Sequence, residues 1–511
     1  MIDRIRDFEA DGQRALAEVV APALMRPFPA ATIVEVTSPT VQRVPAEAEV
    51  TTRGETPYRF RLLHDVETGP YRVQNARIVR TAAGEESLQF DVVSTSEAPL
   101  EHAMSDTLRI YVDAPRESAS LVTAHVLGHT QRAELLAQGQ RARTLQLLPD
   151  YGTRAEDALA PEPDGPLTGA EFLREYFLLP EKFAFLELKG LFRALLGTPA
   201  RQATVALRFD APLPARVSLT GDALRAHCVP AVNLFRTTSE PRIFGPGASN
   251  FAVRVAGLSP KNSAVYAIVG ARATPVSSAA GSSPSIPMAP VRRFGAGELS
   301  ASFPYAYSLR FARSGGQTVP MLSLTSPRGT EPLLTPHIIS LDLLATNGDC
   351  PVRPGELSEP GRNVPNGVRV RNVVPASPFV PASVGTELAL HAFVRSAAPG
   401  GDPFFALKSL LFSLVPQNGL DPALVAAQRA RIHGLESLAM ETAIDKGKAR
   451  RGYRASFSID EAPFRGLGDV ALFVRLLHRT LDAQTSVNRF YRCEARCKKS
   501  GVRFVWPKEI A

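Results

Sequence analysis

The chain has 511 residues, 44% hydrophobic and 21% charged, which is enough for about three to four domains with apolar cores. No apolar run approaches the roughly 20 residues of a membrane-spanning helix, and charged residues follow Met1 where a signal peptide would be apolar. Four cysteines, Cys228, Cys350, Cys493 and Cys497, are too few for a disulfide framework, which favours a reduced cytoplasmic protein without direct membrane insertion.

The first third of the chain predicts a short helical segment over 1–30 and an α+β domain over 31–165. A helix is expected from Ile2 to Val20, before Pro22. Alternation of apolar and polar residues then predicts strands at 31–36, 58–62, 71–73, 88–93 and 108–112. A Leu- and Ala-rich segment from Ser118 to about Gln138 predicts a helix in the same domain.

The next domain, predicted over 166–260, opens with a well-marked helix. Thr168 and Glu171 have the spacing of a capping box, and Pro180 closes the helix at about Leu178. Leu173, Tyr176 and Phe177 occupy one face of this helix. After the proline, Phe183 and Phe185 alternate with Lys182 and Ala184, which predicts a half-buried strand.

A β-rich domain is expected over 261–350, with strands near 264–269, 303–311 and 336–344. Residues 273–290, rich in Ala, Ser and Pro, are interpreted as an exposed loop of this domain. Residues 351–382 hold many prolines and are interpreted as a linker that buries no sizeable core.

The last predicted domain, over 383–511, combines helices and strands. A strand is expected at 388–394 and again at 453–459, and helices at 404–414, after Asp421-Pro422 and at 468–481. The chain is expected to end on further strands. The fold class is therefore α+β, multi-domain and β-rich, with short helices and proline-rich connectors.

Basic residues concentrate near the C-terminus and contribute to the net charge of +8. They include Lys446, Arg451, Arg489, Arg496 and Lys499, and no recognisable nucleic-acid module accompanies them. A solvated or protein-facing basic surface is therefore favoured over nucleic-acid binding.

Several segments, in order, carry a family resemblance. The sequence from Leu173 reads LREYFLLPEKFAFLEL, and from Cys228 it reads CVPAVNLF, followed by Glu240-Pro241. Supporting segments are DLLATNGD from Asp342 and SVNRF from Ser486, with a terminal Trp506-Pro507. Together they resemble the TssF family, the baseplate subunit of the bacterial type VI secretion system. Family members usually have a longer helical N-terminal region than this chain.

The resemblance implies a non-enzymatic wedge component that holds and triggers a contractile sheath, in an assembly expected to dock at the inner membrane. It implies as partners a TssG-like subunit, a second copy of the chain, a TssK-like adaptor, and TssE-like and VgrG-like proteins. A wedge protein of a related contractile phage tail or extracellular injection particle remains an alternative. The residues expected to carry this architecture, by packing or at interfaces, are Leu173, Arg174, Tyr176, Phe177, Pro180, Phe183, Phe185, Pro230, Asn233 and Phe235.

A search for catalytic, cofactor and metal motifs yields none that is complete. His125 and His129 have helical metal-ligand spacing but lack the glutamate of a zincin motif, and Cys493 and Cys497 complete no zinc pattern. The sequence thus predicts no enzyme, no cofactor and no bound metal. A carbohydrate-active β-sandwich enzyme is the remaining enzymatic alternative, and a single tryptophan argues against it. Asn233, flanked by apolar residues, is interpreted as a buried clasp at a strand bend.

Overall fold

The structure is a computed structural model that describes Ala17 and most residues from 20 to 506. Outside the described residues are 1–16, 18–19, 82–83, 138–139, 150, 162–167, 214–216, 218, 246–249, 277–284, 292–304, 315–316, 326–335, 383–385, 387–388, 391–392, 394–401, 417–419, 446–449, 484–488 and 507–511. Most of the helix predicted from Ile2 to Val20 falls there, and so does the start of the SVNRF segment.

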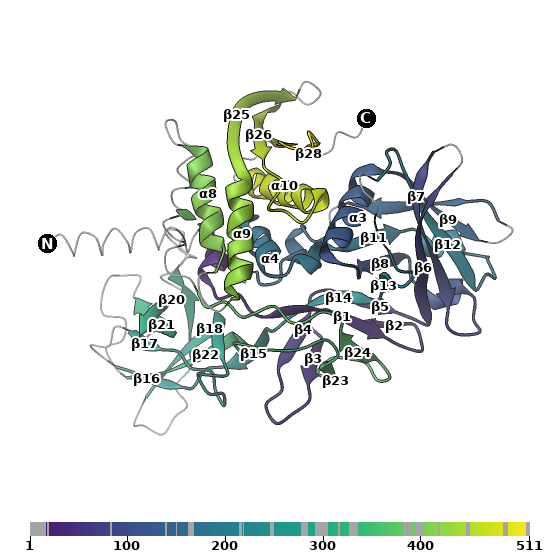
Figure 1. Ribbon diagram of the computed structural model, residues 1–511. Coiled ribbons are helices and arrows are strands. Elements are labelled where there is room, and N and C mark those ends of the chain that lie inside the picture. Colours follow the sequence, from purple (N-terminus) through teal and green to yellow (C-terminus); the bar gives the residue numbers. More distant parts are fainter. Residues whose placement is uncertain are drawn as a thin grey trace.

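The first sheet unites strands from distant parts of the chain (Figure 1). β1 pairs antiparallel with β14 on one side and with β24 on the other. The strand order of this first sheet is β23 (Leu357–Pro360), β3 (Glu49–Thr52), β4 (Arg59–Leu62), β14 (Cys228–Val232), β1 (Ala31–Thr37) and β24 (Arg369–Asn372). A small sheet of β2 (Gln42–Val44) and β5 (Val66–Thr68) accompanies it.

The prediction of an exposed linker over 351–382 is wrong. This segment supplies β23 and β24, and Leu357, Val368 and Val370 are buried in the core of the first sheet. Both strands lie at sheet edges, where a proline such as Pro360 can lack its N–H without breaking an interior hydrogen-bond ladder. The proline in β23 is therefore compatible with an edge strand.

The second sheet curls until its two edge strands, β6 and β13, touch. The Ala76 N–H donates to the Gly221 carbonyl across this seam, over 3.0 Å. Its strand order is β13 (Leu224–Ala226), β8 (Thr107–Val112), β11 (Phe185–Lys189), β10 (Arg143–Leu148), β9 (Thr130–Ala137), β12 (Gln202–Phe209), β7 (Glu86–Ser94) and β6 (Tyr71–Arg80). Helix α3 (Arg116–His129) packs against it, and α2 (Leu100–Ala103), α5 (Leu191–Leu195) and the 3-10 helix η2 (Ala155–Asp157) lie in its connections.

The helix predicted from Ser118 to about Gln138 is only half right. It ends at His129, and Thr130–Ala137 forms strand β9 between β10 and β12. Although Ala and Leu favour helix, pairing with a neighbour on each side satisfies the backbone of β9 and overrides that preference.

The third sheet is built on the long antiparallel pair β18 and β22. Its strand order is β15 (Phe235–Thr238), β22 (His337–Thr346), β18 (Ala264–Pro275), β19 (Ile286–Pro290), β20 (Tyr305–Ser314), β21 (Gln317–Thr325) and β17 (Asn250–Ala252), and β16 (Arg242–Phe244) also pairs with β22. The exposed loop predicted over 273–290 needs correction, because β18 and β19 occupy both of its ends. Met288 and Ala289 are buried there, and Met288 packs in the core of the sheet.

The C-terminal part forms a sheet against helices, with β26 and β27 parallel. Its elements are α8 (Pro403–Leu414), α9 (Pro422–Gly434), β25 (Leu435–Asp445), β26 (Arg450–Ile459), α10 (Leu467–Asp482), β27 (Tyr491–Cys497) and β28 (Arg503–Trp506). The strand predicted at 388–394 is wrong, because its described residues, Ala389, Leu390 and Phe393, are helical. Leu390 and Phe393, three residues apart, both face the helical core, as on one helix face.

Helix α4 (Ala170–Leu178) and the 3-10 helix η3 (Pro180–Phe183) lie in the middle of the molecule, between the C-terminal helices and the sheets (Figure 1). The 3-10 helix η1 (Pro22–Met25) packs on α4. The packing does not follow the contiguous domain boundaries drawn from the sequence. Helix α4 shares its core with the segment after residue 383, while β11, only a few residues later, belongs to the second sheet.

Candidate functional site

The start of α4 is set by a close approach to α10. Gly169 has a φ of 79°, and a Cβ there would lie 2.7 Å from the Arg479 carbonyl oxygen, so only glycine fits. The Glu171 carboxylate accepts from the Thr168 N–H at 3.0 Å and from its hydroxyl at 2.9 Å. The predicted pairing of Thr168 with Glu171 thus exists, although Gly169 is the N-cap residue.

The strand predicted from Lys182 begins only at Phe185, which is a correction. Pro180 opens the 3-10 helix η3 instead, so Lys182 and Phe183 are turned inward and both are buried. Proline suits the first position of such a helix because its fixed φ is helical and its missing N–H would be unpaired there.

The apolar face of α4 packs on α10. The rings of Tyr176 and Phe473 lie 5.6 Å apart, and Phe177 lies 6.5 Å from Phe473. The Tyr176 hydroxyl donates to Asp469 at 2.7 Å, and burial raises the pKa of Tyr176 well above its usual range. Residues separated by almost 300 positions therefore form one packed unit.

Helix α10 also locks onto α3 of the second sheet. A Cβ at Gly468 would stand 2.3 Å from the backbone nitrogen of Leu121, so this glycine allows the two helices to cross in contact. Further along α10, Arg475 donates to the Pro149 carbonyl at 2.6 Å and to the Thr153 hydroxyl at 3.0 Å. Helix α10 thereby joins α3, α4 and the C-terminal sheet.

The polar side of α4 and η3 carries a buried ion pair. The Lys182 ammonium donates to the Glu175 carboxylate, and both side chains are almost completely buried. Glu175 also accepts from the Leu159 N–H at 2.7 Å. Burial raises the pKa of Glu175 and lowers the pKa of Lys182, so removal of either partner would leave a poorly tolerated group.

Arg174 ties α4 to the N-terminal part of the described chain. Its guanidinium donates to the Arg26 carbonyl at 3.1 Å and to the Ala23 carbonyl at 2.9 Å, and it stacks over the Phe28 ring at 5.2 Å. Burial lowers the pKa of Arg174.

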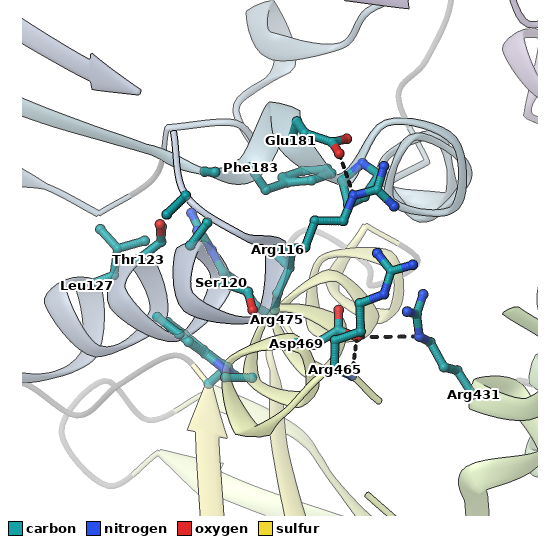
Figure 2. Close-up of a pocket in the computed structure, with 18 residues that line it drawn as sticks. Arg116, Ser120, Thr123, Leu127, Glu181, Phe183, Arg431, Arg465, Asp469 and Arg475 are labelled. Carbon is teal, nitrogen blue, oxygen red and sulfur yellow. Dashed lines mark hydrogen bonds and ion pairs between the residues drawn. The ribbon is translucent and has the colours of Figure 1, made fainter. Parts of the chain in front are cut away.

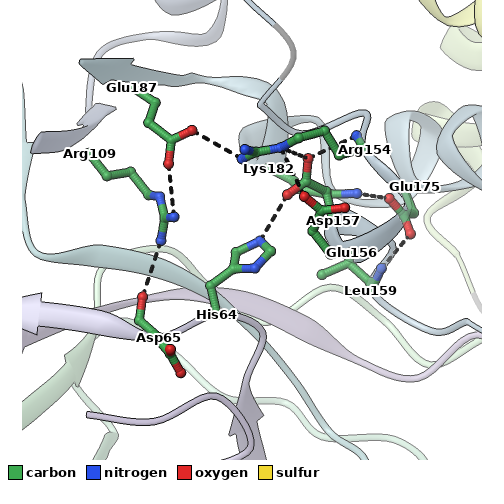
Figure 3. Close-up of polar contacts among 10 residues, drawn as sticks. All are labelled: His64, Asp65, Arg109, Arg154, Glu156, Asp157, Leu159, Glu175, Lys182 and Glu187. Carbon is green, nitrogen blue, oxygen red and sulfur yellow. Dashed lines mark hydrogen bonds and ion pairs between the residues drawn. The ribbon is translucent and has the colours of Figure 1, made fainter. Parts of the chain in front are cut away.

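A second ionic network lies between the Glu175–Lys182 ion pair and the second sheet (Figure 3). Glu187 contacts Arg109 at 3.0 Å and Arg154 at 3.1 Å. Arg154 and His64 in turn both contact Asp157 at 3.1 Å. Burial alone would raise the pKa of Asp157, but these contacts and the Arg154 charge lower it to about 2.

A separate clasp joins the first sheet to the third. The Asn233 oxygen accepts from the Thr346 hydroxyl at 2.6 Å and from the Asn347 N–H at 2.7 Å. Its amide nitrogen donates to the Arg59 carbonyl at 2.7 Å and to the Asn347 side chain at 2.9 Å. The chain passes here from β14 into β15, so the geometry matches the interpretation of Asn233 as a clasp at a strand bend.

A comparison with protein families matches residues 11–511 to the family described as Type VI secretion system, TssF. The chain belongs to the TssF family. One curated relative is the type VI secretion system component TssF1 of Pseudomonas aeruginosa, 26% identical over 250 residues. That match spans 43% of this chain and 40% of the relative, less than half of either length.

Solved structures share the fold of this TssF-family chain. A chain of the type VI secretion system TssK-TssF-TssG baseplate subcomplex superposes with a TM-score of 0.78 at 22% identity, over 100% of this chain and 96% of that one. A chain of a baseplate complex from the type VI secretion system gives a TM-score of 0.61 at 19% identity, over 96% and 86%.

The structure places the residues expected to carry the TssF architecture inside the chain. We call the buried residues of α4 and η3, with their partners in α10, the α4 centre. It contains Leu173, Arg174, Tyr176, Phe177 and Phe183, and Phe185 begins β11. The clasp contains Pro230, Asn233 and Phe235. All of them are buried except Pro180, which is partly exposed. They act as packing residues within the monomer, and their effect on assembly remains a prediction.

Sequence reasoning missed the partners of these residues. Gly468, Asp469 and Phe473 complete the α4 centre, and Thr346 and Asn347 complete the clasp. The sequence did contain one signal for the clasp: Thr346 and Asn347 lie in DLLATNGD, a segment that carries the family resemblance. In the structure both residues contact Asn233 directly.

The residues examined as possible metal ligands have ordinary partners. His125 Nε2 lies 3.1 Å from the Ala211 carbonyl, and His129 pairs with Asp210 at 2.7 Å. Cys493 and Cys497 are buried in β27, and burial raises the pKa of both thiols. Over the described part of the chain, no three His, Cys, Asp or Glu residues are grouped as a metal would need. None of the helices described there is both long and apolar enough to cross a bilayer.

Proposed function

We propose that this TssF-family chain is a structural, non-enzymatic subunit of a type VI secretion baseplate. The observation that carries the proposal is the family match over nearly the whole chain, together with a fold shared along its full length with a chain of a TssK-TssF-TssG baseplate subcomplex. The family match also favours a type VI system over a phage tail or injection particle, and a structural subunit over a carbohydrate-active enzyme.

The proposed partners are a TssG-like subunit and a TssK-like adaptor, named after the proteins of that solved subcomplex. A second copy of the chain and TssE-like and VgrG-like proteins would complete the wedge, in a cytoplasmic assembly docked at the inner membrane. The proposed role is to hold the sheath extended and to release it when the wedge rearranges.

The buried centre of the molecule suits this role. Helix α10 locks α3 and α4 together by glycine contacts and by the Tyr176–Asp469 hydrogen bond, so the parts of the monomer are held in one arrangement. Rearrangement during triggering would then occur mainly between subunits, where a packed interface can have two stable arrangements.

Co-expression with the TssG-like subunit of the same system tests the proposal. The wild-type chain should co-purify with it as a stable complex. Phe183→Ala should lower the melting temperature and the recovery of this complex, because truncating a buried Phe commonly costs about 3 to 5 kcal/mol. Phe192→Ala is the matched control, since Phe192 is 43% exposed.

The outcomes separate the function from the packing argument. If the wild-type chain captures no TssG-like subunit, the proposed function is wrong. If Phe183→Ala melts and assembles like wild type, Phe183 does not belong to a packing centre. If it melts normally but fails to assemble, Phe183 is an interface anchor.

A further inference from the structure

A small cleft opens between α3, η3, the start of α10 and β28 (Figure 2). Its volume is about 60 Å³. At roughly 10 to 15 Å³ for each enclosed water, the cleft has room for one side chain and not for a nucleotide or an organic cofactor. Arg116 at its mouth is exposed, and Ser120 and Arg465 are partly exposed, so the cleft is open to an incoming group.

The charges that line the cleft are unbalanced. Four arginines, Arg116, Arg431, Arg465 and Arg475, face two carboxylates, Glu181 and Asp469. In Figure 2 the guanidinium groups of Arg116, Arg431 and Arg465 lie on the same side of the cleft. Over the whole lining, positive charges therefore exceed negative ones by two.

Both carboxylates already have partners. Glu181 pairs with Arg116 at 2.5 Å. Asp469 accepts from the Tyr176 hydroxyl and from the Arg465 backbone N–H, and it lies 3.4 Å from Arg431. The guanidinium of Arg465, by contrast, makes no hydrogen bond or ion pair with any of the described residues. Burial lowers the pKa of Arg465, and the positive charges of Arg116 and Arg431 lower it further, while the charges of Asp469 and Glu181 oppose the shift. The pKa remains lowered overall, so an added anion would stabilise the charged guanidinium.

Two neutral polar groups in the lining also lack a hydrogen-bond partner among the described residues. The Thr123 hydroxyl and the indole N–H of Trp506 are buried and lack a hydrogen bond among the described residues. Thr123 as a whole is 5% exposed. Because buried polar groups are nearly always hydrogen-bonded in folded proteins, these two indicate a cleft that is completed by a ligand or by water.

The rest of the lining is apolar. Leu127, Phe183 and Leu472 form walls beside the arginines. A ligand that fits both parts has a carboxylate on a short hydrocarbon stem, as an acidic side chain of a polypeptide does. Apolar walls and a volume of one side chain make a nucleic-acid backbone a poorer fit.

We propose that this cleft binds one acidic side chain of a partner protein, with its carboxylate at Arg465 and its methylene carbons on Phe183 and Leu472. The partner is a subunit of the same assembly, so the inference rests on the proposed function. Asp or Glu on the partner would pair with Arg465 in a partly dry environment, where a charge-assisted hydrogen bond is strong.

Fluorescence gives a direct test because Trp506, in the cleft wall, is the single tryptophan of the chain. The purified full chain is titrated with three probes: the capped peptide acetyl-Leu-Glu-Leu-amide, the same peptide with Gln in place of Glu, and inorganic phosphate. The Glu peptide should change Trp506 emission with saturation, and the Gln peptide should bind at least tenfold more weakly.

Two variants locate the binding site. Arg465→Ala should weaken the Glu peptide at least tenfold without changing the melting temperature, because its guanidinium makes no hydrogen bond or ion pair with the described residues. Arg496→Ala is the matched control, since Arg496 is an exposed arginine of β27 outside the cleft. It should bind the peptide as the wild type does.

The same two positions are then compared as glutamate variants in the complex with the TssG-like and TssK-like subunits. Arg465→Glu should reduce recovery of a complex that the wild type and Arg496→Glu form normally. An equal response to phosphate and Glu peptide would overturn the proposal in favour of a small-anion site. No response to any probe, or normal assembly of Arg465→Glu, would also overturn it. Failure of the wild type to assemble would instead count against the proposed function, and the peptide titration would still judge the cleft.

Discussion

The α4 centre and the Asn233 clasp solve the same problem with different chemistry. Both join segments that are far apart in sequence, but the α4 centre buries an ion pair, Glu175 with Lys182, whereas the clasp uses a neutral amide. Burying two charges costs much of the attraction that they gain, while an amide with all of its hydrogen bonds made is desolvated at smaller cost. The ion pair should therefore be easier to replace as a unit and worse to break in half.

Breaking the ion pair should have the largest effect. Glu175→Leu or Lys182→Met alone should lower the free energy of unfolding by about 3 to 5 kcal/mol, because a lone charge remains buried. The double variant should recover most of this loss, since it removes both charges and keeps apolar volume. Thermal and urea unfolding of the four proteins measure the effect.

An exposed pair of the same residue types is the control. Lys498 and Glu436 lie 2.9 Å apart with side chains 62% and 36% exposed. Glu436→Leu should change stability by less than about 1 kcal/mol, as exposed ion pairs do. A double variant at 175 and 182 that is as unstable as the single ones would contradict the comparison.

Removing the neutral clasp should have the next largest effect. Asn233→Ala leaves the Arg59 carbonyl and the Asn347 backbone N–H without the partners that Asn233 supplies. Each buried group left unsatisfied costs about 1 to 3 kcal/mol. Limited proteolysis should then cut near the junction of β14 and β15 sooner than in the wild type. Gln42→Ala, which removes an amide with exposed hydrogen bonds, should behave like wild type. Equal resistance of Asn233→Ala to protease and heat would show that the clasp is dispensable.

The smallest expected effect is a pH dependence of stability that comes from His125, outside both the α4 centre and the clasp. Burial lowers the pKa of His125 from 6.5 to about 4, as does the nearby His129, while Ala211, Asp210 and Glu86 oppose the shift. Between those two pH values the unfolded chain binds a proton that the folded chain does not, so stability falls as pH falls through this window.

His125→Gln removes this titration and keeps a donor for the Ala211 carbonyl. Melting temperatures of wild type and variant should therefore converge, or cross, as the pH is lowered from 7.5 to 5. Parallel curves over that range would show that His125 does not contribute to the acid sensitivity of the fold.

Local patterns predicted the elements of both junctions but not their contacts. Helix α4 followed from Leu173, Tyr176 and Phe177 on one face, and the helix expected at 468–481 corresponds to α10. Nothing local indicated that Tyr176 meets Asp469, because that hydrogen bond depends on how separate parts of the chain pack. The burial of Lys182 was missed for the same reason, since its only visible property was charge.

The errors in the fold have a common physical origin. Helix was predicted over 130–137 and a linker over 351–382 from residue preferences alone. In the folded chain, β9 pairs with a strand on each side, and β24 pairs with β1. Pairing with distant strands satisfies the backbone and outweighs the modest preferences of individual residues.

The separation of 293 positions between Tyr176 and Asp469 has a consequence for synthesis. At about 5 to 20 residues per second, the ribosome adds that stretch in roughly 15 to 60 s, and α4 has no α10 to pack on during this time. The apolar face of α4 is open to wrong contacts meanwhile, whereas Glu175 and Lys182 remain hydrated. We expect the nascent chain to depend on chaperones until α10 has emerged, and its final closure to be late and cooperative.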